Sequence, residues 1–465
     1  MLLGIVFGAV FLTVFGSLSL FVLSENRLQT HIEASTEAFS LAEAGLEYYK
    51  WFLAHNPGDV ENGTGGPGPY VISFNDPEGG TAGTATLTIS DNTACGQSTA
   101  IDIEAEGASD ANPSVTRTLT ARYAQPSVGI YSYVLNDSVW AGDDRVILGP
   151  YHSNGGVRMD GTANSSVTSS LETWNCTDSY GCNPTQSSAP GVTGDGPNQN
   201  LWSWPVPQVD FNGIAADFGT LKTTAQAEGI YYPRYSTTNG QGDPAYWRGY
   251  HLIFNANRTV TVRRVSSTIQ SSVTPVNPAD GNTDRILINN ENNYETRTIP
   301  TDCGLIFVED NVWIEGQISG KITLVAANIV NANISPNVYV RDDVEYVSGG
   351  GVDGLTVIAE HNVLIAPDAP NSMTMNGIFI AQDGALGMNA YSCGSGNATK
   401  TGTLTILGTT VSNKRTGTKW SSSCGGYNKG YQTRVDSYDN NLAYDPPPFT
   451  PTISDDYTFI RWREE

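Results

Sequence analysis

The first 55 residues limit what this chain can fold into more than any other stretch. Residues 1–23, MLLGIVFGAVFLTVFGSLSLFVL, contain no charged side chain and are long enough to cross a bilayer. They run without a proline into residues 24–55, where apolar side chains recur at three- and four-residue steps on one helical stripe: Ile32, Phe39, Ala42, Leu46, Tyr49 and Leu53. The Asn56-Pro57 pair disfavours a longer helix. The sequence therefore predicts one helix of roughly 80 Å, at ~1.5 Å per residue.

This stretch resembles the N-terminal helix of type IV pilins and pseudopilins, and AFSLAEAGLEYYKWFL (38–53) is similar to the end of the PilX-type N-terminal segment. In that family the helix first anchors the subunit in the inner membrane. The pilus assembly machinery then packs it among copies of itself in the core of an extracellular filament. The resemblance implies these partners and this localisation. One position departs from it, because most pilins carry a glutamate at the fifth mature position, where this chain has Ile5.

Apolar side chains on this helix are the residues expected to drive assembly, because each large one left in water costs about 1.5 to 3 kcal/mol. The set is Met1, Leu2, Leu3, Ile5, Val6, Phe7, Val10, Phe11, Leu12, Val14, Phe15, Leu18, Phe21, Phe39 and Leu46. The alternative is an ordinary signal sequence or membrane anchor. A secretory signal has a basic segment before its apolar run, and here no Lys or Arg precedes Arg27. This favours a leader that has been removed, with Met1 as a processed N-terminus.

The balance of acidic and basic residues limits the kinds of molecule that the chain is expected to bind. Forty-seven acidic and 24 basic residues give a net charge of −23, which argues against nucleic acid, since phosphate binding needs a basic patch. Charged residues make up only 15% of the chain, and glycine is abundant. This composition is typical of a secreted, β-rich protein whose acidity keeps its surface soluble.

The six cysteines predict disulfides, because their number is even and the chain is expected to be exported. Cys176 and Cys182 enclose a turn-like TDSYG, and Cys393 and Cys424 bracket a Gly/Ser/Thr-rich stretch. By elimination Cys95 pairs with Cys303. The five histidines, at positions 31, 55, 152, 251 and 361, form no metal-ligand spacing with the cysteines, so a zinc site is not expected.

Residues 57–125 are predicted to form a β-sheet head behind the helix. A Gly/Pro-rich connector leads to four stretches of β character, at 70–74, 84–90, 100–105 and 115–123, separated by turn sequences such as DPEGG. A four-stranded antiparallel sheet of this kind resembles the pilin head. Residues 1–56 and 57–125 together therefore predict a nearly complete pilin module.

Residues 126–465 are predicted to form a second domain with internal repeats. LIFVEDNVWI (305–314), ITLVAANIV (322–330) and LTVIAEHNVLI (355–365) each place an asparagine between apolar runs, while 375–386 and 404–411 follow more loosely. This pattern is typical of a right-handed parallel β-helix or solenoid; a β-sandwich with long loops is the competing fold. Asn311, Asn328 and Asn362 are expected at equivalent corners, where asparagines can form a ladder. Segments 131–140 and 146–159 are interpreted as earlier turns. The predicted fold class is α+β, mostly β.

Residues 171–250 interrupt the pattern and are interpreted as an insertion. It carries Trp174, Trp202, Trp204 and Trp247, which are more often the core of such an insertion but, if exposed, could stack on the sugar rings of a surface glycan. The C-terminus, from a proline run to TFIRWREE, is interpreted as a tail on this domain or on a neighbouring subunit. VSNKRTGTKW and the final WREE resemble regions attached to PilX-type N-termini in proteins of candidate bacterial phyla, which adds architecture and no chemistry.

No motif in the sequence predicts catalysis. The chain lacks GxSxG, HExxH and P-loop patterns. The acidic pairs Asp143-Asp144, Asp342-Asp343 and Asp455-Asp456 lie in turn-like sequence and are interpreted as solvated turns. No cofactor is expected, although the loops 142–145, 281–285 and 341–345 offer oxygen ligands for a structural Ca²⁺ without matching an EF-hand.

The sequence thus predicts a non-enzymatic, structural subunit of a type IV pilus-like filament, with a large β-rich head for surface contact. Three alternatives remain. The chain is a minor or tip subunit with an adhesive head, a membrane-anchored adhesin that does not polymerise, or, least favoured, an anchored polysaccharide-acting β-helix enzyme.

Overall fold

The computed structural model describes residues 2–56, 58–213, 215–235, 244–393, 398–454 and 456–464. The chain divides into two compact units. The first unit comprises Met1–Asn92, Ala100–Ala124 and Asp456–Glu465, and the second comprises Thr93–Thr99 and Gln125–Asp455. The fold is mostly β with one long N-terminal helix, as the sequence predicts.

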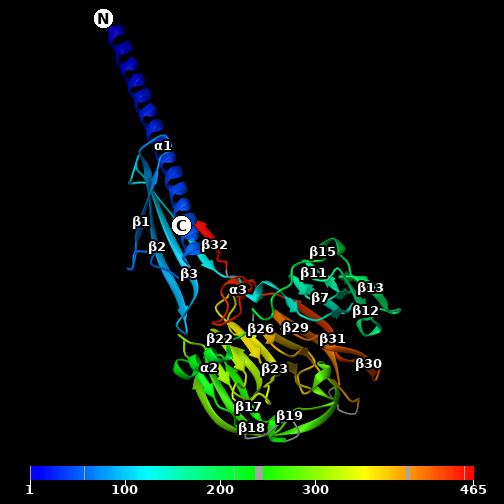
Figure 1. Ribbon diagram of the computed structural model, residues 1–465. Coiled ribbons are helices and arrows are strands. Elements are labelled where there is room, and N and C mark those ends of the chain that lie inside the picture. Colours follow the sequence, from blue (N-terminus) through cyan, green and yellow to red (C-terminus); the bar gives the residue numbers. More distant parts are fainter. Residues whose placement is uncertain are drawn as a thin grey trace. The chain divides into compact units, whose positions relative to one another are not determined.

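The first unit is built on helix α1 (Leu2–His55), which is unbroken as predicted (Figure 1). Within its apolar half the few polar side chains turn back onto the helix. The hydroxyls of Thr13, Ser17 and Ser19 donate to carbonyls three or four residues earlier, at 2.8–2.9 Å. These bonds satisfy each hydroxyl inside the helix itself, so the N-terminal half presents an apolar exterior.

An antiparallel sheet packs against the second half of α1. Its first four strands match the four predicted ones: β1 (Tyr70–Asn75), β2 (Thr81–Ala94), β3 (Gln97–Ser109) and β4 (Thr116–Ala124). A fifth strand, β32 (Thr458–Glu464), pairs with β4 and completes the order β1-β2-β3-β4-β32. The interpretation of the C-terminus as a tail on the second domain was therefore wrong, and the predicted domain 126–465 ends before β32.

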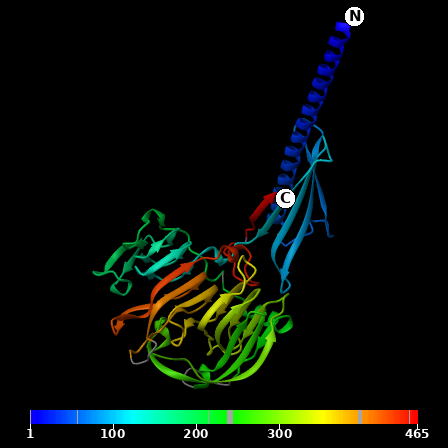
Figure 2. The same cartoon turned by 180° about the vertical axis from the view of Figure 1, so that it is seen from behind.

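The second unit consists mainly of parallel ladders. The first ladder contains β16 (Ile230–Tyr232), β20 (Leu305–Val308), β22 (Lys321–Ala326), β24 (Gly354–Ala359), β26 (Met373–Ala381), β29 (Thr399–Ser412), β5 (Tyr133–Leu135), β8 (Tyr151–Ser153), β11 (Val167–Ser169) and β15 (Trp202–Ser203). The second ladder contains β17 (Gly249–Asn255), β21 (Asn311–Ile318), β23 (Val338–Tyr346), β25 (Val363–Ile365) and β27 (Leu386–Gly387). These strands run side by side in Figure 2.

A third ladder continues from the ends of β21 and β23 through β26 and β29 to β31 (Tyr427–Ser437), β7 (Arg145–Leu148) and β10 (Thr162–Ala163). Three short parallel strands form a separate sheet: β6 (Val139–Ala141), β9 (Val157–Met159) and β14 (Val192–Thr193). The remaining elements include β12 (Thr173–Cys176), β13 (Gln186–Pro190), β28 (Ala390–Tyr391), β30 (Lys419–Cys424), α2 (Phe218–Ala227) and α3 (Asn440–Tyr444). Valine, isoleucine and leucine side chains of the ladders fill one large core.

Two sequence interpretations of this unit need correction. Segments 131–140 and 146–159 do contribute strands to the ladders, as predicted. They do not precede the other ladder strands, however, because β5 pairs with β29, far along the chain. Residues 171–250 are not a single insertion either, since β15, β16 and β17 are members of the ladders. A repeated local pattern specifies a strand and a corner, but not which copy stacks on which.

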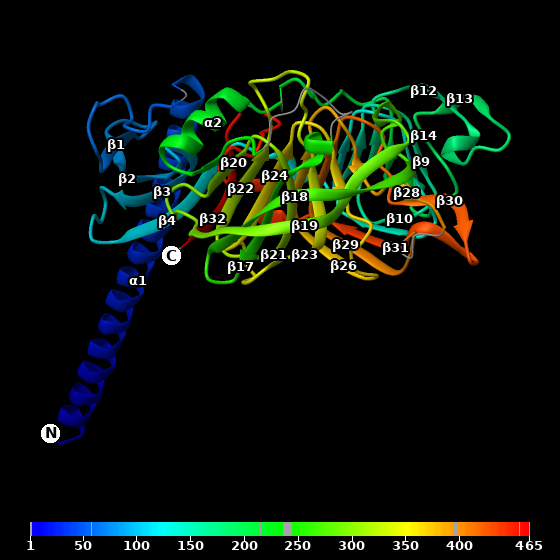
Figure 3. The same cartoon turned by 90° about the horizontal axis from the view of Figure 1, so that it is seen from below.

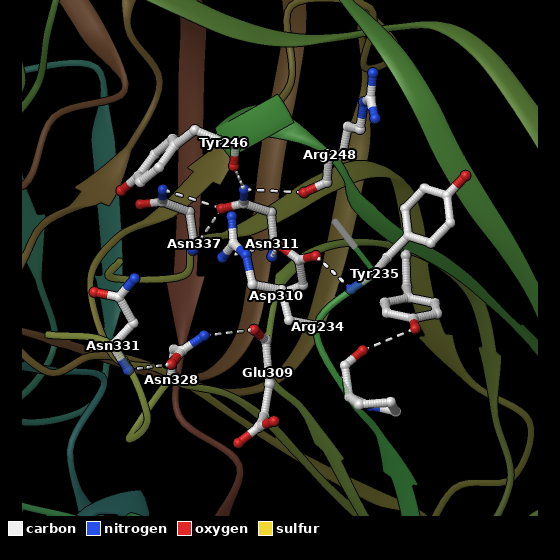
Figure 4. Close-up of polar contacts among 12 residues, drawn as sticks. Arg234, Tyr235, Tyr246, Arg248, Glu309, Asp310, Asn311, Asn328, Asn331 and Asn337 are labelled. Atoms are coloured by element: carbon white, nitrogen blue, oxygen red, sulfur yellow. Dashed lines mark hydrogen bonds and ion pairs between the residues drawn. The ribbon is translucent and has the colours of Figure 1, made fainter. Parts of the chain in front are cut away.

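A buried asparagine ladder marks one corner of the second unit (Figure 4). The Oδ1 atom of Asn311 accepts from the backbone N–H of Asn337 at 3.0 Å, and Oδ1 of Asn337 accepts from that of Asn362 at 3.1 Å. The prediction was right for Asn311 and Asn362. It was wrong for Asn328, whose Oδ1 instead accepts from Val330 and Asn331 of its own turn.

A long hairpin, β18 (Thr259–Thr274) and β19 (Thr283–Thr298), crosses the second ladder (Figure 3). Beneath it lies a second apolar cluster that includes Val265 and Ile286 of the hairpin and Trp313 and Tyr339 of the ladder. The Nε1–H of Trp313 donates to the carbonyl of Ile286 at 2.7 Å. This hairpin therefore covers the outer face of the second ladder.

Three disulfides pair the six cysteines as the sequence analysis expected. They join Cys95 to Cys303, Cys176 to Cys182 and Cys393 to Cys424. Cys95 lies in Thr93–Thr99, the tip of the β2–β3 hairpin, which is counted with the second unit.

Candidate functional site

The N-terminal half of α1 is an uncovered apolar surface. Every described side chain from residue 3 to residue 33 is exposed, over roughly 45 Å at ~1.5 Å per residue. Leu3, Leu12 and Phe7 are 74%, 74% and 71% exposed, and Phe15 is 57% exposed. The uncharged part of this surface, residues 3–23, is roughly 30 Å long at ~1.5 Å per residue. An apolar surface of this length requires a bilayer or other apolar side chains to cover it. Within the described residues, α1 alone has the length and apolar composition to cross a membrane.

The C-terminal half of α1 is held by its own sheet. Ala38, Ala42 and Tyr49 are fully buried, and Leu46 contacts the same core as Leu87 of β2. The backbone of β3 approaches the helix closely at Gly107, where an added Cβ would lie 1.9 Å from the carbonyl oxygen of Ala38. The sheet therefore shields only the second half of the helix.

Most of the residues predicted for assembly lie on the uncovered surface. These are Leu3, Ile5, Val6, Phe7, Val10, Phe11, Leu12, Val14, Phe15, Leu18 and Phe21. Met1 lies outside the described residues, and for Leu2 only the backbone is described. Phe39 and Leu46 were wrongly included, because Phe39 packs on Trp462 with ring centres 5.9 Å apart and Leu46 is 1% exposed. The helical stripe continues past the point where the sheet begins to cover it, so periodicity alone could not separate the two halves.

Charged side chains of α1 begin only beyond the apolar half. Ile5 is 67% exposed. Glu25 is the first acidic residue, and Arg27 the first basic one. Both are exposed. The apolar surface is thus free of charge among the described residues up to Ser24.

Carboxylates in two of the acidic turns noted in the sequence interact with other residues of the same chain. Asp144 lies 2.9 Å from Arg434 and 3.2 Å from Lys419, and these cations hold its pKa below the usual value against the opposing effect of burial. Asp343 accepts from the backbone N–H of Thr374 at 2.7 Å. Asp455 lies outside the described residues.

The remaining loop that was predicted to bind calcium, 281–285, has a buried carboxylate, that of Asp284. Asp284 accepts from Tyr391 at 2.8 Å and from Asn389 at 3.0 Å, and burial raises its pKa. In the part of the chain that the structure describes, no group of three or more His, Cys, Asp or Glu side chains is arranged to hold a metal ion. A structural Ca²⁺ stays a prediction.

The sequence missed a buried ionic cluster around His251 of β17. This imidazole is 0% exposed, and its Nδ1 lies 2.8 Å from Glu291 of β19 while its Nε2 lies 3.5 Å from Glu315 of β21. Arg263 of β18 and Arg341 of β23 pair with the two carboxylates at 2.5 and 3.8 Å. Burial lowers the pKa of His251, but the hydrogen bond with Glu291 and the charges of the two glutamates outweigh it and raise the pKa above its usual value.

This cluster has a structural role, because it joins the hairpin to the second ladder. His251 lies between the two, so no substrate can reach its imidazole ring. The negative charges of the two glutamates beside it are also balanced by Arg263 and Arg341, as charges removed from water require. No sequence signal could have found the cluster, because its members come from five strands that are separate in the chain.

The tryptophans of 171–250 do not form one exposed surface. Trp174 is 6% exposed and packs with the Cys176–Cys182 staple, and its Nε1–H donates to Pro190 at 2.9 Å. Trp202 is half-buried and packs against the apolar core formed by the short strands in the N-terminal part of the second unit. Trp204, 37% exposed, is the most accessible of those four. Trp174 is therefore core, as the sequence favoured, and stacking of an exposed tryptophan on a glycan stays a prediction.

No protein-family model and no curated protein matches this chain. Among solved structures, one similar chain is the competence-associated pilin ComZ from Thermus thermophilus, with 11% sequence identity over 93% of this chain and 98% of that one. The TM-score is 0.27. A TM-score this low does not establish that the two chains share a fold or a function.

Proposed function

We propose that this chain is a structural subunit of an extracellular type IV pilus-like filament and that it polymerises through α1. The observation that carries the proposal is the division of one continuous helix into a half held by its own sheet and a half left uncovered. Burying the large apolar side chains of the uncovered half against neighbouring helices stabilises the assembly by tens of kcal/mol, at about 1.5 to 3 kcal/mol each. Before assembly the same surface suits the inner membrane.

The second unit is proposed to be a parallel β-solenoid that the filament displays. Its parallel ladders and the buried asparagine ladder are the features that support this description. We propose no catalytic activity and no cofactor for it, since the imidazole of His251, which lies between two glutamates, is fully buried.

A minor or tip subunit is the second candidate. Two features favour it: the carboxylate that pairs with a neighbour's terminal amine in most pilins is replaced by Ile5, and the second unit, Gln125–Asp455, is far larger than the first. A membrane-anchored adhesin that does not polymerise is the third.

Replacing Phe15 by Asp tests the assembly proposal. Phe15 lies in the middle of the uncovered half and is 57% exposed, and a carboxylate buried between apolar helices costs several kcal/mol. We expect Phe15→Asp to abolish filaments sheared from the cell surface, as counted by electron microscopy and by mass spectrometry. Val71→Asp, at a 61% exposed position of β1, is the matched control and should leave filament yield unchanged.

The amount of each variant in the membrane fraction separates assembly from insertion. A Phe15→Asp subunit at wild-type membrane level without filaments supports polymerisation through α1, whereas normal filaments from this variant exclude it. Antibody against the second unit then distinguishes the candidates, because a major subunit labels the whole filament and a tip subunit labels one end.

A further inference from the structure

The second unit carries a groove that no sequence motif predicted. Its volume is about 600 Å³, within the range of roughly 300 to 1,000 Å³ that small-molecule sites occupy. Tyr131, His152, Thr168, Gln208, Asp210 and Ser454 are among its lining residues. They come from five separate parts of the chain, which is why no local pattern reveals the groove.

The floor of the groove is polar but uncharged. His152 on β8 and Thr168 on β11 are register neighbours in the first ladder. The Nδ1 atom of His152 lies 2.9 Å from the Thr168 hydroxyl, and its Nε2 lies 3.0 Å from Oδ1 of Asn154. His152 is 3% exposed, and burial lowers its pKa. Both ring nitrogens are thus occupied by neutral partners.

One wall of the groove, residues 206–210, is fixed by backbone hydrogen bonds. Asn154 accepts from the N–H of Val209 at 2.9 Å and donates to its carbonyl at 2.8 Å. The N–H of Val206 donates to the carbonyl of Ser169 at 3.0 Å. The backbone that carries Gln208 and Asp210 is therefore fixed without a ligand, which lowers the entropy lost on binding.

The opposite wall is also fixed. Thr452 forms a β-bridge with Ser127, and the N–H of Ile453 donates to the carbonyl of Pro126 at 3.0 Å. Ile453 belongs to an apolar cluster beneath the groove that also includes Tyr131. The groove thus combines a half-buried aromatic ring and apolar patches with hydroxyl, amide and carboxylate groups.

We propose that this groove binds a short, neutral oligosaccharide. None of the described residues that line it is a lysine or an arginine, so it has no cation to hold a phosphate, sulfate or carboxylate of a ligand. Hydroxyls and amides hydrogen-bond sugar hydroxyls, and an aromatic ring such as Tyr131 packs on the apolar C–H face of a sugar. This inference goes beyond the assembly proposal and does not depend on it.

The groove binds sugar without cleaving it. Glycoside hydrolysis by the common mechanisms requires two carboxyl groups that flank the bond. Asp210 is the one acidic side chain among the described lining residues. His152 cannot substitute for a second acid or base, because its two nitrogens already bond Thr168 and Asn154.

Glycan binding by the full chain tests the proposal. The wild-type protein, dispersed in a detergent without a sugar headgroup, is applied to an array of neutral, sialylated and sulfated oligosaccharides, and the best neutral oligosaccharide is then titrated by calorimetry. We expect saturable binding to a neutral oligosaccharide. Gln208→Ala should weaken it about tenfold, the effect of losing one hydrogen bond, and Gln208→Arg should abolish it by filling the groove.

Gln186→Arg is the matched control, because Gln186 is exposed on β13 and does not line the groove. Equal melting temperatures of the two arginine variants establish that Gln208→Arg folds. Absence of binding to every neutral oligosaccharide, binding to acidic ones alone, or equal affinity of the Gln208→Arg and Gln186→Arg variants would overturn the proposal. Phe15→Asp should bind as wild type, so a failure of assembly and a failure of glycan binding remain distinguishable.

Discussion

At the scale of single residues, His251 shows how a buried imidazole is held in the second unit. The imidazole is fully buried between two glutamates, and each glutamate also pairs with an arginine. A buried charge persists in this setting only because its partners compensate for lost hydration. The cluster joins the β18–β19 hairpin to β17, β21 and β23, so it connects the cover of the second ladder to the ladder itself.

This cluster predicts a pH dependence of stability. The pKa of His251 is raised in the folded state, so its stabilisation is complete below the unfolded value of about 6.5 and is lost as pH rises through the folded pKa. The pKa of Glu291 is lowered to about 2, since His251 and Arg263 outweigh burial. Its stabilisation is present above about 4.5 and lost as pH falls toward 2. The cluster therefore stabilises the fold most between about pH 4.5 and 6.5.

Replacing His251 by Gln tests this dependence. The variant leaves the half-buried carboxylates of Glu291 and Glu315 without the imidazolium between them, and we expect it to lose about 3 kcal/mol of unfolding free energy at pH 6. The loss should shrink as pH rises above 6.5. Denaturant unfolding at several pH values measures it, with His31→Gln, at an exposed helical position, as the control. A loss that is the same at pH 6 and pH 9 would mean that His251 acts through packing alone.

At the scale of elements, the contact between α1 and β3 depends on a glycine. A Cβ at Gly107 would lie 1.9 Å from the Ala38 carbonyl oxygen and 2.6 Å from the Ala42 nitrogen. Both are backbone atoms, so helix and strand would have to separate. Gly107→Ala should therefore lower the unfolding free energy of the first unit by about 3 kcal/mol.

Thermal unfolding of the full chain, followed in the first unit, checks this value. Gly66→Ala is the matched control, because a Cβ there meets nothing within 4 Å and the backbone does not require a positive φ. If the two alanine variants melt together, α1 and β3 do not pack as closely as these distances imply.

Sequence patterns predicted where the helix and strands lie better than they predicted which strands pair with one another. The helix, the first four strands and two corner asparagines were predictable because periodicity, turns and asparagine conformations are local properties. Asn337 was missed, since it follows Pro336 in a segment without the repeated pattern. β32 was missed because a proline-rich segment precedes it, and its pairing with β4 depends on residues more than 300 positions away. The groove lining and the His251 cluster depend on the same long-range stacking.

At the scale of the whole molecule, the second unit is an insertion in the first. In sequence it lies between β4 and β32, which are neighbours in the first unit's sheet. Its own two ends also meet, since Ser127 forms a β-bridge with Thr452. A chain that leaves and re-enters a sheet at adjacent strands can gain a large inserted unit without changing the order of that sheet. This connectivity explains how one chain forms both a small helix-and-sheet unit and a much larger unit.

The disulfides act on the whole chain through the unfolded state. Cys95–Cys303 spans 208 residues of sequence, whereas Cys176–Cys182 spans 6. In the chain-entropy account, closing the longer loop removes more unfolded conformations, which predicts about 5 kcal/mol of stabilisation against about 2 to 3 kcal/mol for the shorter loop. All four cysteines are buried, at 4%, 2%, 0% and 1% exposure, so the local costs of replacing them are similar.

Paired serine variants separate loop closure from local packing. Cys95→Ser/Cys303→Ser should lower the free energy of unfolding about twice as much as Cys176→Ser/Cys182→Ser, measured by denaturant titration under non-reducing conditions. The remaining disulfides stay intact in each variant, which keeps the comparison matched. Equal losses would indicate that the serines act mainly by placing hydroxyls in apolar surroundings. A larger loss for the shorter loop would show that the β12–β13 staple, with Trp174 packed on it, matters more than the long-range link.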